Sequence, residues 1–291
     1  MRHSKFLVTG FLALMALSFT ACSSSDDDGK DWGKIEQPAH IADAARYKVT
    51  TIGSKWKSVE LTEGGRYFIV LENNMLSSSS DDDVIYSGSY EKKDDHYVLN
   101  GFGELTIIPN KQSFKLLLNN QGYVSNLSAQ KAGTLSSNKA NDYLCRTWRL
   151  VKYHVDVTYD GKKVYEGTST SATEIYNGLK SAMNASEYKD KLKLSKTLLD
   201  DIEDLDILRT ITFTHTGSYY VTNTDSREDM MYYWKWMNFN ELVIAFSDEE
   251  NNFSAKDRAS LQFEDGQLKM NEYQSEGREK INVVTTFQPV K

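Results

Sequence analysis

Short segments in which apolar and polar residues alternate run through most of this chain, and they constrain its fold more than any other feature. In the clearest segment, Val151–Tyr159, every second residue is valine or tyrosine and the residues between them are polar. Successive side chains of a strand point to opposite faces, so this pattern predicts a half-buried β-strand. Asp160-Gly161 comes next, a pair typical of a two-residue hairpin turn, and Lys162–Glu166 would return beside the first strand. The chain is therefore predicted to be mainly β and antiparallel.

Residues 47–135 are predicted to form an N-terminal β domain. Short segments rich in branched and aromatic residues recur there, separated by turn-forming sequences such as Glu63-Gly64-Gly65. This regular spacing is typical of a meandering antiparallel sandwich or barrel. Residues 22–46 are predicted to be an acidic flexible tether, with a short helix around Ile41–Arg46. The predicted strands of the domain are Lys55–Leu61, Arg66–Glu72, Val84–Glu91, His96–Asn100, Glu104–Ile108, Phe114–Leu118 and Tyr123–Leu127.

Residues 143–291 are predicted to form a second β domain, after a Ser-, Asn- and Lys-rich boundary at 134–142. Its first strand is expected from Tyr143, and residues 171–206 are predicted to be a helical insert. Ser171 would cap the first helix, with Glu174 as its reciprocal partner. Residues at helical spacing would be buried, namely Ile175, Leu179, Met183, Leu194, Leu198, Ile202 and Leu205. Strands are expected again at Thr210–Phe213, Tyr219–Thr222, Met231–Met237, Leu242–Phe246, Ser260–Phe263, Leu268–Tyr273 and Ile281–Phe287.

Residues 1–21 have the order of a secretory signal peptide. Arg2 and Lys5 supply positive charge, and an apolar run covers residues 6–17. This run is too short to span a bilayer, which takes about 20 apolar residues. The segment Phe19-Thr20-Ala21-Cys22 resembles a lipobox, although the family pattern prefers leucine at the place of Phe19. The resemblance implies cleavage before Cys22 and acylation of that cysteine, including palmitate. A plain secreted protein is the alternative.

An acidic run, Asp26-Asp27-Asp28, comes shortly after Cys22. Clustered like charge and low hydrophobicity favour an extended, solvated spacer. The run also resembles the acidic export signal that sends some lipoproteins to the outer face of the outer membrane. The expected location is therefore the outer membrane, lipid-anchored through Cys22 and exposed on the cell surface.

Charge and cysteine content exclude some classes of function and stabilisation. Removal of residues 1–21 takes away Arg2 and Lys5 but no acidic residue, which changes the formal charge from −7 to −9. An acidic surface repels phosphate backbones, so no nucleic-acid partner is expected. Once Cys22 is acylated, Cys145 is the last thiol and no internal disulfide can form. Each domain must be stabilised by its own hydrophobic core.

The segment Leu144–Leu150 resembles the opening strand of bacterial lipocalin-like domains. Those strands typically read Leu, any residue, Gly, Thr, Trp, Arg, Leu, and here Arg146 takes the place of the glycine. The resemblance covers about residues 143–290, with a fainter echo over 47–130, and implies that Trp148 closes one end of a barrel. Tyr219 lies in a segment that resembles the second strand of the family. Members carry small apolar ligands or have no known role, and fold does not fix function.

A sparse internal repeat suggests that the two halves are duplicates. The order of residues is kept while the gaps differ, and an ordinary β meander that reuses aromatic and branched residues is the alternative. The matched sets are Trp56 and Val59 with Trp148 and Val151, Gly65 and Tyr67 with Gly217 and Tyr219, and Phe102, Glu104, Leu105 and Ile107 with Phe239, Glu241, Leu242 and Ile244.

No arrangement of residues typical of an enzyme or a metal site is found. The histidines have no zinc-ligand spacing, and no serine elbow or phosphate-binding loop occurs. We expect no cofactor and no metal, and Cys145 is interpreted as a small core residue. Acidic clusters around Asp200 and Asp248 leave a glycoside hydrolase as the less favoured alternative, since such pairs depend on separation in space.

The best candidate for a binding surface is the aromatic stripe formed by Tyr232, Trp234 and Trp236. In a strand these three side chains point to one face, and Tyr233, Lys235 and Met237 point to the other. Facing inward beneath the helices of 171–206, the stripe would line a barrel and bind a small apolar ligand. Facing outward, it would recognise a glycan or a protein. Ordinary core packing is the third interpretation. The leading hypothesis is a non-enzymatic, surface-anchored lipoprotein that binds a small apolar ligand.

Overall fold

The computed structural model describes residues 32–34, 44–72, 83–108, 112–119, 124–136, 138–202, 207–224, 229–254 and 257–290. The signal peptide and Cys22 lie outside these residues, as do Ile41–Asp43 and Leu205. As predicted, the chain is mainly β, with antiparallel strands in two sheets and a pair of helices inserted into the second.

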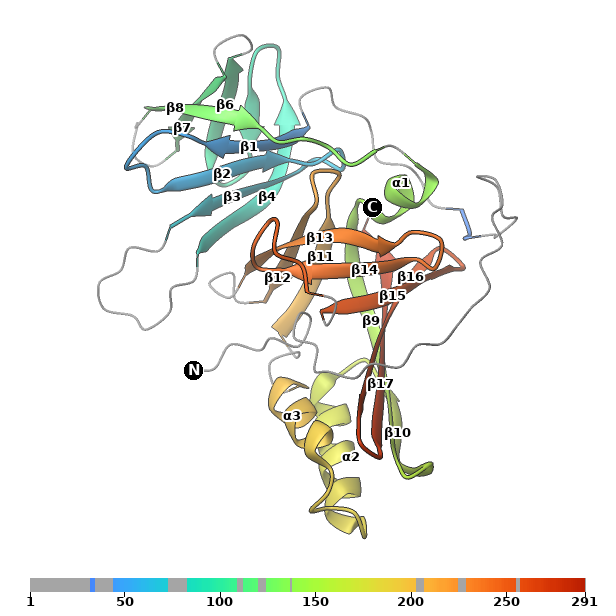
Figure 1. Cartoon of the computed structure of the whole chain (residues 1–291). Helices are drawn as coiled ribbons and strands as arrows, with labels where there is room; N and C mark the ends of the chain where they lie inside the picture. Colours follow the sequence, from blue (N-terminus) through green and yellow to red (C-terminus); the bar gives the residue numbers. More distant parts are fainter. Residues whose placement is uncertain are drawn as a thin grey trace. The chain divides into compact units, whose positions relative to one another are not determined.

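The first sheet is a closed barrel of eight antiparallel strands in sequence order, with β8 paired to β1 (Figure 1). Its interior contains an apolar cluster that includes Leu99, Leu105 and Leu116, each with no exposed surface. Alternation of these residues with polar ones explains why one face of every strand turns inward. The strands are β1 (Ala45–Val49), β2 (Trp56–Leu61), β3 (Arg66–Leu71), β4 (Val84–Lys92), β5 (Tyr97–Leu99), β6 (Gly103–Ile108), β7 (Ser113–Leu118) and β8 (Val124–Lys131).

The prediction of a short helix around Ile41–Arg46 is wrong for its described part. Ala45 and Arg46 begin β1, where Arg46 lies opposite Glu60 of β2. The alanine-rich sequence favours a helix locally. Pairing with both β2 and β8 overrides this preference, because β1 closes the barrel.

The second sheet has nine strands, and the additional pairing of β9 with β17 closes eight of them into a second barrel. Along one edge of β9, the first half of the strand pairs with β11, and the second half, Tyr153–Tyr159, pairs with β10. The hairpin turn between β9 and β10 is at Asp160-Gly161, as predicted, and both residues have positive φ (52° and 75°). The strands are β9 (Thr147–Tyr159), β10 (Lys162–Ser169), β11 (Leu208–Phe213), β12 (Ser218–Asn223), β13 (Met230–Asn238), β14 (Val243–Ser247), β15 (Arg258–Glu264), β16 (Gln267–Glu276) and β17 (Glu279–Pro289).

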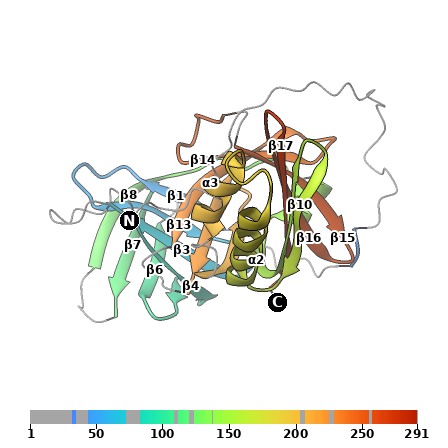
Figure 2. The same ribbon diagram turned by 90° about the horizontal axis from the view of Figure 1, so that it is seen from below.

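Helices α2 (Ala172–Ala185) and α3 (Lys193–Ile202) pack against the long ends of β9, β10, β16 and β17 (Figures 1 and 2). The apolar helix residues predicted at this spacing are buried, among them Leu179 (0 % exposed) and Leu198 (1 %). They meet Val155, Val157 and Ile281 on one face of the strands. The helices therefore cover the strand ends that extend past the position of β11.

Only one of the two hydrogen bonds of the predicted capping box forms at the start of α2. The Ser171 side chain accepts a hydrogen bond from the backbone N–H of Glu174, at 3.4 Å. The Glu174 carboxylate, however, bonds the hydroxyl of Ser169 instead of the backbone of Ser171. The preceding strand brings that hydroxyl within reach, which sequence spacing does not reveal.

The strand predicted from Tyr143 is also wrong, because Lys139–Leu144 form helix α1. Asn138 caps its start by accepting a hydrogen bond from the N–H of Asn141, at 2.8 Å. The Arg146 guanidinium donates to the carbonyls of Tyr143 and Asp142, both at 2.8 Å, and so satisfies the end of the helix. The strand starts at Thr147, and the arginine at the motif glycine position has a capping role.

By internal contacts the chain divides into two compact units. The first-barrel unit comprises Glu36–Thr147 and Thr212–Met231, and the second-barrel unit comprises Met1–Ile35, Trp148–Ile211 and Tyr232–Lys291. The segment Thr212–Met231, which carries β12, thus belongs to the second sheet by strand pairing and to the first-barrel unit by its contacts.

Candidate functional site

The aromatic stripe of β13 faces the inside of the second barrel. Trp234 lies opposite Phe246 and Trp236 opposite Ile244 on β14, and Ile244 lies opposite Ala259 on β15. Paired residues share one face of a sheet, and Phe246, Ile244 and Ala259 are all buried. Of the orientations considered from the sequence, the inward one is therefore present.

Exposure differs along the stripe. Trp234 is 1 % exposed, whereas Tyr232 and Trp236 keep part of their surface. Trp236 contacts Trp234 and Phe239 edge to face, with ring centroids at 5.7 and 5.3 Å, and Phe239 is 41 % exposed. The stripe thus continues from the barrel interior to the surface at the end of β13.

An acidic residue also lies on the inward face. On β16, Glu272 follows Leu268 and Met270 at a spacing of two, and both of these have no exposed surface. Its partner across the strand pair is Val283, part of the cluster under the helices. Burial and, secondarily, the charge of Asp201 in α3 raise the pKa of the Glu272 carboxyl to about 8. Glu272 was not predicted as a site residue, although an acid at an inward position of a strand is a signal that could have revealed it.

A second acid, Glu279, holds α3 in place. Its carboxylate accepts hydrogen bonds from the backbone N–H groups of Leu194 (2.9 Å) and Ser195 (2.8 Å) and from the Ser195 hydroxyl (2.5 Å). Glu279 is only 2 % exposed. A carboxylate at a helix N-terminus satisfies free N–H groups and the helix dipole, so β17 fixes where α3 begins.

Trp32 and Trp148 both contact the ring of Phe263, on β15 of the second barrel. Trp148 is fully buried and stacks on Phe263 at 6.5 Å between centroids, and Trp32 contacts the same ring at 4.9 Å. The Gly266 N–H donates to the Trp32 carbonyl at 3.2 Å. Gly33, with φ +83°, allows this approach, because a Cβ there would lie 2.3 Å from the Gly266 nitrogen. Three residues of the predicted tether, 32–34, are thus described, and the first of them is buried.

The other motif residues contribute to the cores. Trp56 is half-buried beside Phe102, at 6.2 Å between centroids. Tyr67 is 3 % exposed, and its hydroxyl donates to the carbonyl of Asn100, at 3.1 Å. Tyr219 is fully buried against Phe213, at 4.7 Å between centroids.

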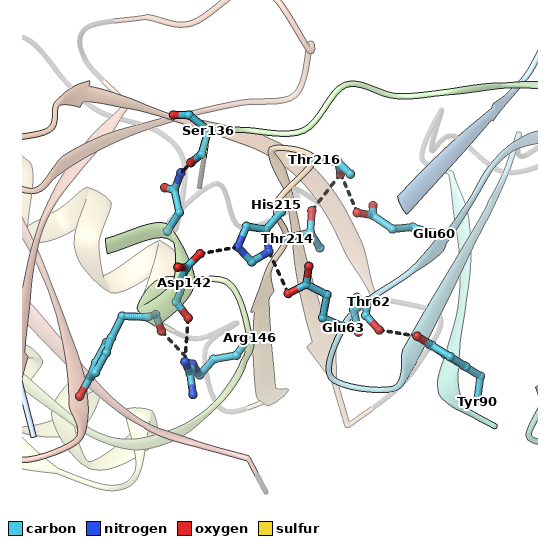
Figure 3. A network of polar contacts seen from close by, with 12 residues as sticks. Glu60, Thr62, Glu63, Tyr90, Ser136, Asp142, Arg146, Thr214, His215 and Thr216 are labelled. Carbon is cyan, nitrogen blue, oxygen red and sulfur yellow. Dashed lines mark hydrogen bonds and ion pairs between the residues drawn. The ribbon is translucent and has the colours of Figure 1, made fainter. Parts of the chain in front are cut away.

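A network of polar contacts in the first-barrel unit was not predicted (Figure 3). His215 lies between two carboxylates, with Nε2 3.3 Å from Asp142 and Nδ1 3.5 Å from Glu63. Thr216 donates to Glu60 at 2.6 Å, and the Tyr220 hydroxyl donates to the same carboxylate at 2.7 Å. Burial and the charge of Glu60 raise the pKa of Tyr220.

This network joins segments distant in sequence and is interpreted as structural. Glu60 is 1 % exposed, and each of its carboxylate oxygens accepts a hydrogen bond. Buried carboxylates with such partners are stable. Cys145, near the network, is fully buried, and burial and the surrounding acidic groups raise the pKa of its thiol well above the ordinary value. It therefore stays a thiol, which agrees with its interpretation as a core residue.

The acidic clusters considered for glycoside hydrolysis lie in ordinary structural positions where they are described. Asp200 and Asp201 lie in α3, and 203–206 lie outside the described residues. Glu249 sits in the loop after β14, where its carboxylate bonds Asn252 at 3.1 Å. Within the described ranges, no cluster of three or more His, Cys, Asp or Glu side chains could hold a metal ion. No helix in the described part of the chain is long and apolar enough to cross a bilayer.

None of the protein-family models or curated proteins compared with this chain matches it.

Proposed function

We propose that this chain is a lipoprotein, anchored at the cell surface through acylated Cys22, whose second barrel binds a small apolar ligand without catalysis. The observation that carries the proposal is the inward orientation of Tyr232, Trp234 and Trp236 in a closed barrel. Aromatic side chains provide large apolar contact area, and binding sites for small molecules combine such area with few polar groups.

Partial exposure on the inward face supports this proposal. Tyr232 and Trp236 keep accessible surface, in contrast to the fully covered leucines inside the first barrel. Helices α2 and α3 cover the continuation of the same strand face at the other end of β9 and β17. An apolar ligand needs a surface shielded from water, because burial of its area supplies the binding free energy.

The position of Trp32 fits an anchored carrier. Trp32 is fixed on the second barrel and lies ten residues after Cys22. Ten residues span at most about 35 Å, so an acyl chain on Cys22 would hold the barrel close to the bilayer surface. An apolar ligand partitions into membranes, and a carrier within that distance could exchange it there.

A fluorescence titration tests ligand binding. The chain with Cys22→Ser, which leaves all described residues intact, is titrated with a neutral apolar fluorophore. Saturable binding that weakens at least tenfold in both Trp234→Ala and Trp236→Ala is expected. Tyr273→Ala is the matched control, since Tyr273 is 60 % exposed on β16. Absence of saturable binding would contradict the proposal, as would equal binding by all variants.

Mass spectrometry of the mature N-terminus tests the anchor separately. Acylated Cys22 at the N-terminus is expected, and an unmodified cysteine there would refute lipid attachment. Protease added to intact cells should degrade a surface-exposed protein, while resistance would argue against surface exposure.

Recognition of a glycan or a protein partner is the second candidate function. Met237 and Phe239, 43 % and 41 % exposed, extend the stripe to the surface beside half-buried Trp236. Exposed neighbouring apolar side chains are typical of contact surfaces. Loss of partner binding in Phe239→Ala, with fluorophore binding unchanged, would favour this candidate.

A further inference from the structure

The β13–β14 turn and the β15–β16 turn lie at the same end of the second barrel. Val243, the first residue of β14, pairs with Asn238 at the end of β13 and with Ser260 of β15. β15 then continues to the turn at Asp265-Gly266, where both residues have positive φ (51° and 75°). β16 leads back from this turn to Gly277, at the strand ends that α2 and α3 cover. The helices therefore cover one end of the barrel, and these two turns mark the other.

The aromatic stripe reaches the surface at this turn end. Trp234 is covered inside the barrel, and Trp236 follows it two residues closer to the β13–β14 turn, with part of its surface accessible. Phe239, in the turn itself, contacts the Trp236 ring edge to face at 5.3 Å and is 41 % exposed. Aromatic side chains thus lead from the interior to solvent at the end that the helices do not cover.

Trp32 covers an inward-facing ring at the same end. Phe263, near the end of β15, lies opposite Leu268 of β16, and both side chains are buried. Paired residues share one face of a sheet, so the Phe263 ring belongs to the interior. The Trp32 ring contacts it at 4.9 Å between centroids, and Trp148, at the start of β9, stacks on it at 6.5 Å. Two tryptophans, one of them from outside the sheets, therefore shield this ring from water.

A close backbone contact holds Trp32 in this position. The N–H of Gly266, in the β15–β16 turn, donates to the Trp32 carbonyl at 3.2 Å. Gly33 has φ +83°, and a Cβ there would lie 2.3 Å from the Gly266 nitrogen and 2.9 Å from the Asp265 carbonyl carbon. Any side chain at position 33 would therefore push the segment away from the turn. The contact depends on glycine at this position, and it keeps the Trp32 ring over Phe263.

This contact can break without loss of the barrel. Residues 32–34 form no strand, and the strands of both sheets come later, from Ala45 onward. Departure of Trp32 would leave every strand pair of the second barrel in place and would expose the Phe263 ring. Trp32 is thus buried like a core residue, although it belongs to no strand ladder.

We propose that Trp32 is a lid on the turn end of the second barrel, and that an apolar ligand enters and leaves there when Trp32 moves away from Phe263. The inference rests on the proposed function and adds its regulation. The ligand would pass Phe239 and Trp236 on its way to the stripe. The helices would be a fixed cover, because the buried Glu279 carboxylate accepts three hydrogen bonds at the start of α3.

A lid has a kinetic signature that distinguishes it from a ligand contact and from a core residue. If Trp32 blocks passage without touching the bound ligand, its removal accelerates association and dissociation by the same factor and leaves Kd unchanged. Loss of a ligand contact would accelerate dissociation alone, because contacts in a complex act mainly on that rate. Loss of a core residue would lower the stability of the fold and weaken binding.

Stopped-flow mixing of the Cys22→Ser chain with N-phenyl-1-naphthylamine measures both rates. In Trp32→Ala, association and dissociation are each expected to be faster by about tenfold, with Kd changed by less than about twofold. Gly33→Ala should give the same result with the Trp32 ring intact, since the added Cβ collides with Gly266. Hydrogen exchange of the Gly266 amide, which donates to Trp32, should accelerate in both variants.

Gly277→Ala is the matched control at the other end of the barrel. Gly277 also has a positive φ (60°), but its Cβ would meet nothing within 4 Å. This variant carries the backbone strain of an alanine at positive φ without a collision, so it should leave both rates unchanged. Faster exchange of the probe in Gly277→Ala than in Gly33→Ala would place ligand entry at the helix end and overturn the proposal.

The outcomes separate the lid from the proposed function. If the probe does not bind to the Cys22→Ser chain, the proposed function fails, and the lid fails with it. If the probe binds and both rates are unchanged in Trp32→Ala and Gly33→Ala, the lid is refuted while apolar binding stands. Faster dissociation with unchanged association would make Trp32 a ligand contact, which also refutes the lid. Should Trp32→Ala not fold, Gly33→Ala decides, and unchanged rates there would refute the lid.

Discussion

In the first barrel β1–β8 follow one another directly, whereas the second barrel carries β10, α2 and α3 between its first strand and its second. Both barrels are closed antiparallel meanders with eight strands in sequential order. In the first, the longest strand is β4 with nine residues; in the second, β9 has 13 and β17 has 11. The longer strands extend past β11 and provide the apolar face that the helices cover.

The two interiors differ in polarity. Leucines with no exposed surface, such as Leu99 and Leu105, fill inward positions of the first barrel. Buried aromatic residues occur in both, such as Phe114 in the first and Trp234 in the second, but the second also has Glu272 at an inward position, and its carboxyl has no described partner. A closed meander by itself needs only an apolar interior. The insert and the unpaired acid are therefore the features that point to a role for the second barrel.

One pair of turns is the same in both halves. In each, a threonine N–H donates to the carbonyl four residues later, at 2.8 Å for Thr62 and 3.0 Å for Thr214. The threonine hydroxyl accepts from the N–H of that later residue, and Gly65 and Gly217 have φ of 76° and 79°. Glu63 and His215 hold equivalent places after the two threonines. The two turns contact each other through these residues, since Nδ1 of His215 lies 3.5 Å from the Glu63 carboxylate.

This turn bears on the predicted duplication. The common strand order agrees with that prediction, and the Gly65/Tyr67 and Gly217/Tyr219 pairs both precede or begin the third barrel strand. Trp56, however, lies in the second strand of its barrel and Trp148 in the first. The Phe102 set leads into the sixth strand and the Phe239 set into the fifth. One of the three matched sets thus falls on equivalent strands.

The largest expected effect compares Trp234→Ala with Phe114→Ala, two fully buried aromatic positions in different barrels. Removal of a packed aromatic side chain costs about 4 kcal/mol of stability. We expect this loss for Phe114→Ala, and a loss smaller by about 1 kcal/mol or more for Trp234→Ala if its ring borders a ligand space. Chemical denaturation, followed by hydrogen exchange in each barrel, measures both. Equal losses would mean that Trp234 is ordinary core.

Glu279→Ala should have the next largest effect, confined to the second-barrel unit. It removes a buried carboxylate that accepts three hydrogen bonds at the start of α3, and we expect this loss to lower the free energy of unfolding by about 3 kcal/mol. Hydrogen exchange should accelerate in α3 but not in β1–β8. Glu276→Ala, an exposed acid near the same hairpin end, should change stability by less than about 0.5 kcal/mol. Unchanged exchange in α3 would show that apolar contacts alone hold the helix.

The pH dependence of stability should differ between the barrels. Burial and Asp201 raise the pKa of Glu272 from 4.5 to about 8. An acid whose pKa is higher in the folded state than in the unfolded state stabilises the fold fully below about pH 4.5. This stabilisation is lost as the pH rises towards 8, because the unfolded state releases the proton first. We expect the second barrel to lose about 2 kcal/mol over that window, since partial exposure reduces the full effect of about 1.4 kcal/mol per pKa unit. Glu272→Gln should remove this loss, while Glu276→Gln should keep it; an identical pH profile for Glu272→Gln would contradict the assignment.

The smallest expected effect tests the equivalence of the two turns. Alanine at Gly65 or at Gly217 must adopt a positive φ, which costs about 1 kcal/mol in each case. Gly133→Ala is the control, because its φ is not positive and its Cβ would meet nothing within 4 Å. Denaturation midpoints measure the three variants. A clear loss at only one of the two turn glycines would show that the turns are not equivalent.

The sequence by itself determined the class of structure and most of its elements. Alternation at Val151–Tyr159, the Asp160-Gly161 turn and the helical spacing of Ile175, Leu179 and Met183 are local patterns, and the structure confirms each of them. Such patterns act through neighbouring residues, so they can be recognised without knowledge of the fold. The aromatic stripe was also found in this way, as one face of one strand.

Only the tertiary structure decided which groups meet. Pairing at both edges turned the predicted helix at Ala45 and Arg46 into a strand, and Arg146 ended a helix where a strand was expected. Closure of the barrel turned Trp234 inward, and packing of α3 against β16 and β17 put Asp201 close enough for its charge to act on Glu272, 71 positions away in the sequence. Contacts between distant segments depend on strand register and barrel closure, and these are set by the sum of many pairings that no single segment encodes.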